Sequence, residues 1–194
     1  MRETRPVSIA GDEQRVPEFP PVHVVPDTVY HYSEDGGISR FAPHVPQTNP
    51  SHPPAVWAMD AAHSPLYWFP RDCPRISVWA NDEAQQATLT EQFGTDASRI
   101  CAAESCWLDR IRRARVYRYG FDGAQFGPWI EADGQYIATE VVQPRSVDLL
   151  DDLLALHAAA EVELRFTPTL GTLTDRMLAS GLPFSFVRIR DARR

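Results

Sequence analysis

Two side chains with acid–base chemistry interrupt segments that otherwise have the pattern of strands. His31 lies in "TVYHYS" (28–33), which is rich in strand-forming residues and is followed by a Gly-Gly turn. Glu140 lies in "GQYIATEVVQP" (134–144), where alternation puts apolar residues on both faces of a predicted strand. A carboxylate is costly to bury alone, so Glu140 either pairs with an arginine or opens onto a cleft and reacts. His31 is either a satisfied core histidine or a ligand contact at a strand end.

The strand face that carries His31 also carries Val29 and Ser33. A neutral imidazole donates one hydrogen bond and accepts another, which suits the binding of a ribose hydroxyl. We therefore take His31 and Ser33 as candidate ligand contacts, with Arg40 in the loop that follows as a further candidate.

The segment "HSPLYWFPRDCPR" (63–75) brings three aromatic residues and two arginines together. Its aromatic run, which includes Tyr67, suits a buried core and equally a flat surface on which a planar ring stacks. Arg71 and Arg75 can fork onto phosphate or carboxylate oxygens. The same arginines can instead form structural ion pairs, for which the nearest candidates are Asp60, Asp72 and Glu140.

Metal ligation is a further chemistry open to the histidines. His44, His52 and His63 are spaced by eight and eleven residues through proline-rich loops, with Asp60 close by. These spacings match no compact zinc motif, and the three cysteines include no second pair. We predict no metal, while a metal-dependent enzyme that uses His44, His52 and His63 stays an alternative. A cysteine nucleophile also stays open, although nothing in the sequence marks an activated thiol.

Composition narrows the class of protein. The chain has 194 residues, 43% of them hydrophobic, which is enough for one domain with a proper core. All 19 basic residues are arginine, which excludes chemistry that needs a lysine. The formal net charge of -7 disfavours general polyanion binding. Five arginines in "DRIRRARVYR" (109–118) are a local exception that suits a solvated surface or a nucleic-acid contact.

The sparse cysteines and the lack of a membrane-length apolar run lead us to expect a cytoplasmic protein with no membrane partner.

The predicted elements point to an α+β fold. We expect residues 1–26 to form a flexible proline-rich arm and residues 27–194 to form a single α+β domain. Short strands without regular β-α-β alternation predict a mostly antiparallel split β-sandwich with flanking helices. Helices are predicted at 100–114, at 147–160 with Ser146 as its cap, and at 173–180.

Two resemblances extend this interpretation. The strings "VYHYSEDGGISRFAPHVP", "AVWAMD" and "YWFPRDCPRI" look like a bacterial family of unknown function with the pattern YHxSED..I..F.P, VWAxD and PRDCPR. That likeness covers most of the chain from Tyr30 onward and implies no activity.

A fainter likeness is to ADP-ribosyltransferase-like proteins, including the DarT group and the RNA 2′-phosphotransferases. It rests on the order of His31, "AVWAMDAAHSPLY" and "ATEVVQP". It implies an ADP-ribosyltransferase-like fold and an enzyme that takes NAD as its substrate. By this likeness His31 grips the ribose, Tyr67 stacks near nicotinamide and Glu140 is the catalytic carboxylate. The phosphate-binding arginines of the phosphotransferases have no clear counterpart, and the acceptor is open. A non-catalytic protein that binds a nucleotide or small molecule is the main alternative.

Overall fold

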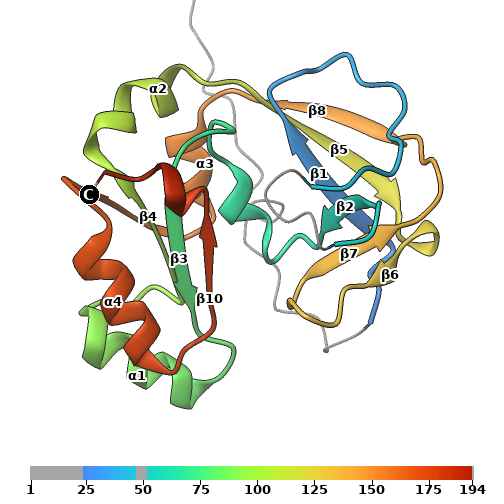
Figure 1. The fold of residues 1–194 in the computed structure, drawn as a ribbon. Coiled ribbons are helices and arrows are strands. Elements are labelled where there is room, and N and C mark those ends of the chain that lie inside the picture. Colours follow the sequence, from blue (N-terminus) through green and yellow to red (C-terminus); the bar gives the residue numbers. More distant parts are fainter. Residues whose placement is uncertain (1–23, 47–51, 194) are drawn as a thin grey trace, which may run out of the picture.

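The computed structural model describes residues 24–46 and 52–193, which form two lobes built around two sheets (Figure 1). The first lobe holds a six-stranded sheet in the order β6-β7-β2-β1-β5-β8. Its strands are β1 (Thr28–Ser33), β2 (Val56–Met59), β5 (Val116–Asp122), β6 (Gly127–Pro128), β7 (Gln135–Ala138) and β8 (Ser146–Leu150).

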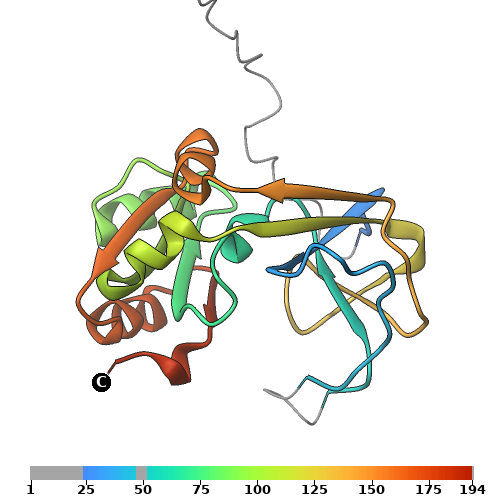
Figure 2. The same cartoon turned by 90° about the horizontal axis from the view of Figure 1, so that it is seen from above.

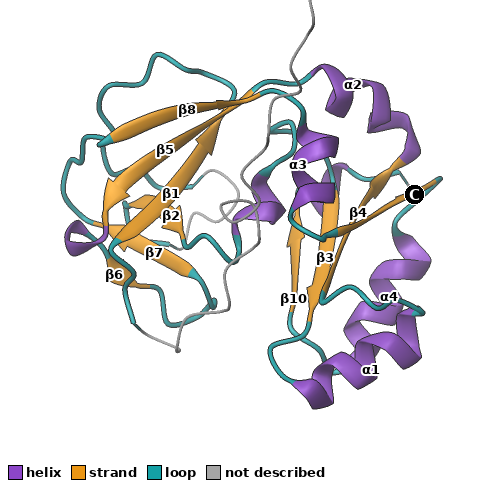
Figure 3. Ribbon diagram, turned by 180° about the vertical axis from the view of Figure 1, so that it is seen from behind, coloured by secondary structure: helices purple, strands orange, loops and turns teal. Residues whose placement is uncertain are grey.

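The second lobe holds a four-stranded sheet in the order β10-β3-β4-β9, and the helices gather around it (Figure 3). Its strands are β3 (Arg75–Trp79), β4 (Arg99–Glu104), β9 (Glu163–Thr167) and β10 (Phe184–Val187). The helices are α1 (Glu83–Phe93), α2 (Leu108–Arg113), α3 (Leu153–Ala159) and α4 (Gly171–Ser180). Pairing is antiparallel throughout the described strands except between β4 and β9. The predicted α+β class with mostly antiparallel sheet is therefore confirmed.

Helices cover both faces of the four-stranded sheet because its strands are apolar on both sides. Ile76 and Ile100 pack on one face against Leu89 of α1 and Met177 of α4. On the other face, Cys101 and Ala103 pack with Ile111 of α2 and Leu153 of α3. The six-stranded lobe has its own core around Val29, Phe41, Tyr119, Phe121 and Tyr136.

The chain passes between the lobes three times, after β2, after α2 and after β8. Figure 2 shows the last two passages side by side, where β5 follows α2 and its partner β8 leads to α3. Each lobe is therefore built from separate stretches of the sequence.

Two helix predictions were wrong at their first halves. Residues 99–104 form β4, whose six residues are all buried, and a strand buried on both faces has a continuous apolar run that resembles a buried helix. Residues 146–150 form β8, which pairs with β5. The helix that follows begins after Asp152, whose carboxylate accepts from the Ala155 amide, and not after Ser146.

Most of the predicted proline-rich arm, residues 1–23, lies outside the described residues. Its last residues pack on the six-stranded lobe, since Val25 joins that core and the Val24 carbonyl accepts from the Tyr136 hydroxyl at 3.1 Å. In the described part of the chain, no helix combines the length and apolar character needed to cross a membrane.

Candidate functional site

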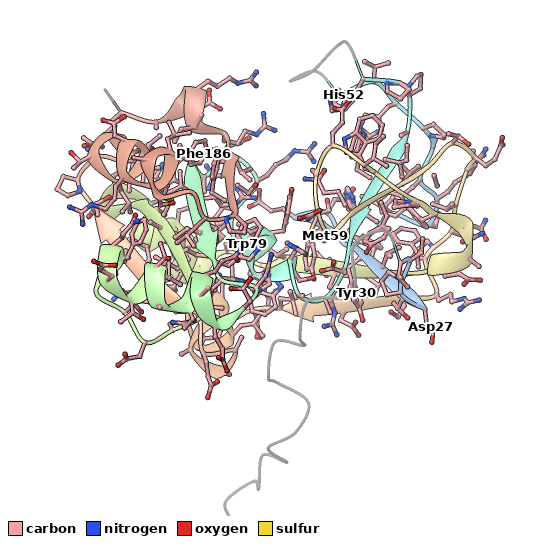
Figure 4. All side chains as sticks on the ribbon, turned by 90° about the horizontal axis from the view of Figure 1, so that it is seen from below. Asp27, Tyr30, His52, Met59, Trp79 and Phe186 are labelled. Carbon is pink, nitrogen blue, oxygen red and sulfur yellow. The ribbon has the colours of Figure 1, made fainter. Side chains whose placement is uncertain are left out.

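A cavity of about 350 Å³ opens between the two lobes. This volume is at the lower end of the roughly 300–1,000 Å³ typical of small-molecule sites. Residues of β1, β2 and β7 line one side, and residues of η1 (Ser64–Tyr67), β3 and β10 line the other. Figure 4 shows His52 and Met59 of the lining on the six-stranded side of the gap, with Trp79 and Phe186 across from them.

Arg75 is the buried cation of this pocket. It is 4% exposed, and it donates from Nε to the Leu66 carbonyl at 2.5 Å and from one terminal nitrogen to the Cys73 carbonyl at 3.0 Å. No carboxylate of the described residues forms an ion pair with it. Burial lowers the pKa of Arg75 because a desolvated guanidinium is a costly charge. Its remaining terminal nitrogen is available to an anion in the pocket.

Two further arginines line the same cavity. Arg188 follows β10, which pairs Val187 with Arg75 and so places the two arginines near each other. Its backbone is left-handed, with φ of 56°, a strained conformation for a residue other than glycine, and its side chain is 3.9 Å from Asp72. Arg71 is exposed at the rim. The pocket lining therefore gathers three arginines in a chain whose formal net charge is -7.

His31 lies on the opposite wall as a neutral hydrogen-bond acceptor. Its Nδ1 is 2.9 Å from the Trp57 carbonyl, which can only accept, so we assign the proton of the neutral ring to Nδ1. Burial lowers the pKa of His31, the Trp57 carbonyl opposes that shift, and Arg71 adds to it. At pH 7 the ring is therefore neutral, with the lone pair on Nε2.

Glu34 is the carboxylate of the pocket lining, and sequence analysis did not single it out. Its Oε2 accepts from the Arg71 amide at 3.1 Å and lies 3.9 Å from the Arg110 guanidinium. A tight turn follows it, in which the Asp35 amide donates to Ser33 and the Gly37 amide donates to Asp35. The segments "SED" and "PRDCPR" thus meet at this contact.

Aromatic rings form much of the remaining wall. Tyr67 and Phe69 lie with their ring centroids 5.5 and 5.4 Å from the Arg75 guanidinium, and Tyr67 stacks on Tyr32 at 6.3 Å. Burial raises the pKa of Tyr67, and it raises that of Tyr32 to about 12, so both phenols are neutral. On the other side His52 packs against Trp57 with a ring distance of 5.2 Å. Both sides offer flat surfaces to a planar ligand.

A buried histidine packs against the segment that carries the aromatic residues of the pocket. His157 of α3 is fully buried, with Nδ1 2.6 Å from the Leu153 carbonyl and Nε2 3.1 Å from the Pro65 carbonyl. Its ring packs against Phe69 at 4.9 Å. His157 therefore links helix α3 to the segment that carries Tyr67 and Phe69.

The structure brings together five of the seven predicted site residues: His31, Ser33, Tyr67, Arg71 and Arg75 line the pocket. The other two, Glu140 and Arg40, do not line it. Glu140 lies outside the lining, exposed in a bend, because β7 ends at Ala138 and the chain turns back to pair Val142 with Phe41. Arg40 is exposed in the loop that precedes this pairing and also lies outside the lining.

The metal and thiol alternatives do not assemble at the pocket. His44 and His52 line it, whereas His63 is buried elsewhere, with Nδ1 2.9 Å from Asp60. Within residues 24–46 and 52–193, no three histidine, cysteine or acidic side chains form a group that could hold a metal ion. Burial raises the pKa of the Cys73 thiol to about 12, which is the opposite of activation.

The arginines of 109–118 make local contacts. The Arg110 guanidinium lies 4.9 Å from the Trp107 ring, Arg112 lies 3.8 Å from Asp109, and Arg118 donates to Asp148 at 3.1 Å. Arg110 also joins this stretch to the pocket through Glu34.

Comparison with known proteins identifies a family and no characterised relative. No curated protein and no solved structure matches the chain. The model of one family, described as a family of unknown function (DUF6886), matches residues 30–192. This range contains all the described pocket residues and most of the sequence, and the chain therefore belongs to the DUF6886 family.

Proposed function

We propose that the pocket binds a small ligand of the nucleotide type, with an anionic group at the arginines and a planar ring against the aromatic wall. The observation that carries this proposal is Arg75, a buried guanidinium without a carboxylate partner among the described residues. A buried charge is costly unless it is paired, so an anionic ligand provides the missing partner. A cavity of about 350 Å³ suits a ligand nearer in size to a mononucleotide than to a dinucleotide.

Isothermal titration calorimetry with AMP and adenosine tests this proposal. We expect AMP to bind roughly 10- to 100-fold more tightly, because a charge-assisted hydrogen bond contributes about 1.5–3 kcal/mol. Arg75→Lys keeps the positive charge but loses the paired N–H donors of the guanidinium. We expect it to remove most of the difference in affinity between AMP and adenosine. Arg188→Gln tests the same subsite at a less buried residue, which guards against a misfolded Arg75 variant. Arg40→Gln is the matched control at an exposed arginine outside the pocket. The proposal fails if neither AMP nor NAD binds at millimolar concentration, or if AMP and adenosine bind equally.

An NAD-dependent ADP-ribosyltransferase-like activity is the second candidate. It is supported by the position of His31 and Tyr67 in one pocket between two sheets, as the split-sandwich likeness implies. In this reaction the bond between C1′ and the nicotinamide nitrogen breaks, neutral nicotinamide leaves, and an acceptor forms the new bond and loses a proton. A carboxylate near C1′ stabilises the positive charge on the ribose. Glu140 lies outside the pocket lining, and Glu34 is the carboxylate of that lining, which makes it the candidate for this role.

Release of nicotinamide from NAD by the purified protein is the assay for this activity. Turnover that is lost in Glu34→Gln supports the transferase, whereas tight NAD binding without any release leaves a binding protein.

A further inference from the structure

Glu34 is an unexpected residue in a pocket with three arginines. A carboxylate there repels the anionic group that the arginines attract, by an amount that depends on their separation. The Arg110 guanidinium, 3.9 Å away, offsets part of this repulsion, and a ligand with hydrogen-bond donors at this point would offset more of it. Oε2 of Glu34 is already held by the Arg71 amide, while Oε1 has no hydrogen-bond partner within the described part of the chain.

The backbone turn that follows Glu34 is held by two tyrosines. The Tyr119 hydroxyl donates to the Asp35 carbonyl at 2.6 Å and accepts from the Ile38 amide at 3.2 Å. Gly36 lies so close to the Tyr117 ring that a Cβ at this position would be 2.4 Å from the nearest ring carbon. The backbone that follows Glu34 is therefore fixed before a ligand arrives, although the Glu34 side chain itself is exposed, and this limits the entropy lost on binding.

His31 is a second acceptor on the β1 side of the pocket lining. Its Nδ1 proton is used on the Trp57 carbonyl, so Nε2 has only a lone pair to offer. Glu34 follows His31 by three residues, directly after β1. The β1 side of the lining thus offers two acceptors, and a pair of neighbouring hydroxyl groups on a ligand would supply two donors for them. Phosphate and carbonyl oxygens only accept, so they are directed to the Arg75 and Arg188 side.

We infer that Glu34 is a specificity-determining residue that selects ligands with a vicinal diol, as in a ribose, and orients their anionic group toward Arg75. This inference rests on the proposed function. It sets the orientation of the ligand, with the phosphate at the arginines and the ribose hydroxyls at Glu34 and His31.

Calorimetry with AMP, 2′-deoxy-AMP and 2′,3′-dideoxy-AMP tests it. The wild-type protein is expected to bind AMP roughly 10- to 100-fold more tightly than the dideoxy compound, the range for hydrogen bonds to a charged group. In Glu34→Gln this preference falls to a few-fold, because a neutral acceptor makes a bond of about half the strength. The preference for AMP over adenosine stays, since it depends on the arginines. Glu91→Gln, an exposed glutamate on α1, is the matched control.

Glu34→Gln keeps an oxygen for the Arg71 amide, so we expect its melting temperature to stay near that of the wild type. Glu34→Asp is a second variant, which keeps the carboxylate on a shorter side chain. Its preference for AMP over dideoxy-AMP should lie between those of the wild type and Glu34→Gln. Equal binding of AMP and dideoxy-AMP by the wild type, or an undiminished preference in Glu34→Gln, overturns this inference and leaves the proposed function standing. A wild-type protein that binds no phosphate-bearing compound overturns both.

Discussion

Acid should destabilise this protein through His157 in a way that can be measured. Burial lowers the pKa of His157 to about 4, against 6.5 for an ordinary histidine, and the Leu153 and Pro65 carbonyls only partly oppose that shift. The unfolded chain therefore takes up a proton at a pH where the folded protein does not. Stability from this residue is fully present above pH 6.5 and is lost as the pH falls toward 4.

The magnitude follows from the gap between the two pKa values. A difference of one pH unit corresponds to about 1.36 kcal/mol, so a fall from 6.5 to about 4 removes about 3 kcal/mol of unfolding free energy. That is a large share of the roughly 5–15 kcal/mol that stabilises a typical domain. His31, whose pKa is lowered mainly by burial, adds a loss of the same sign.

Urea unfolding followed by tryptophan fluorescence at a series of pH values from 8 to 4 isolates the contribution of His157. His157→Gln retains a donor for one carbonyl but does not titrate, so its unfolding free energy should decline less than that of the wild type, by about 3 kcal/mol over this range. Above pH 7 the two profiles should run parallel, which is the internal control. Parallel profiles down to pH 4 would refute the reasoning, because they would mean that the folded protein accommodates a charged His157.

Three other predictions concern exposed and tightly packed positions. Glu140→Gln should leave AMP affinity, nicotinamide release and the melting temperature unchanged, since this side chain is exposed outside the pocket; a loss of either activity would restore Glu140 as a site residue. Native protein should react with Ellman's reagent at one thiol, that of exposed Cys106, because Cys73 is buried with its pKa raised to about 12; a second fast thiol would contradict this packing. Gly36→Ala should lower both the melting temperature and AMP affinity because the added Cβ collides with the Tyr117 ring, and an unchanged affinity would show that the turn does not position Glu34.

Local patterns in the sequence were sufficient for the parts of the site that depend on one strand or one short segment. Alternation and the Gly-Gly turn placed His31 in a strand whose observed bounds match the predicted ones. The cluster of aromatic residues and arginines before β3 pointed to Tyr67, Arg71 and Arg75, all of which line the pocket. These features are set by neighbours close in sequence.

The parts that depend on distant pairing could not be predicted in this way. The strand that was expected to carry Glu140 ends at Ala138, because Ala138 pairs with Val56, the first residue of its antiparallel partner β2. This limit is set by a strand distant in sequence. Arg188 follows β10 in a left-handed conformation, and the alternation of "PFSFVRIR" (183–190) gives no signal for the end of the strand there. Glu34 follows a strand in a turn-like sequence, and only its contact with Arg71 makes it part of a pocket.

The three passages of the chain between the lobes have a practical consequence for dissection of the protein. Neither lobe corresponds to a continuous stretch of the gene, because β1 and β2, then β5 to β8, alternate with the elements of the other lobe. A cut at any point between β1 and β10 therefore divides the strands of at least one sheet between the two fragments and exposes apolar surface. Fragments expressed separately should aggregate or remain unfolded, and recovery of ligand binding will require that both be present in the same refolding mixture.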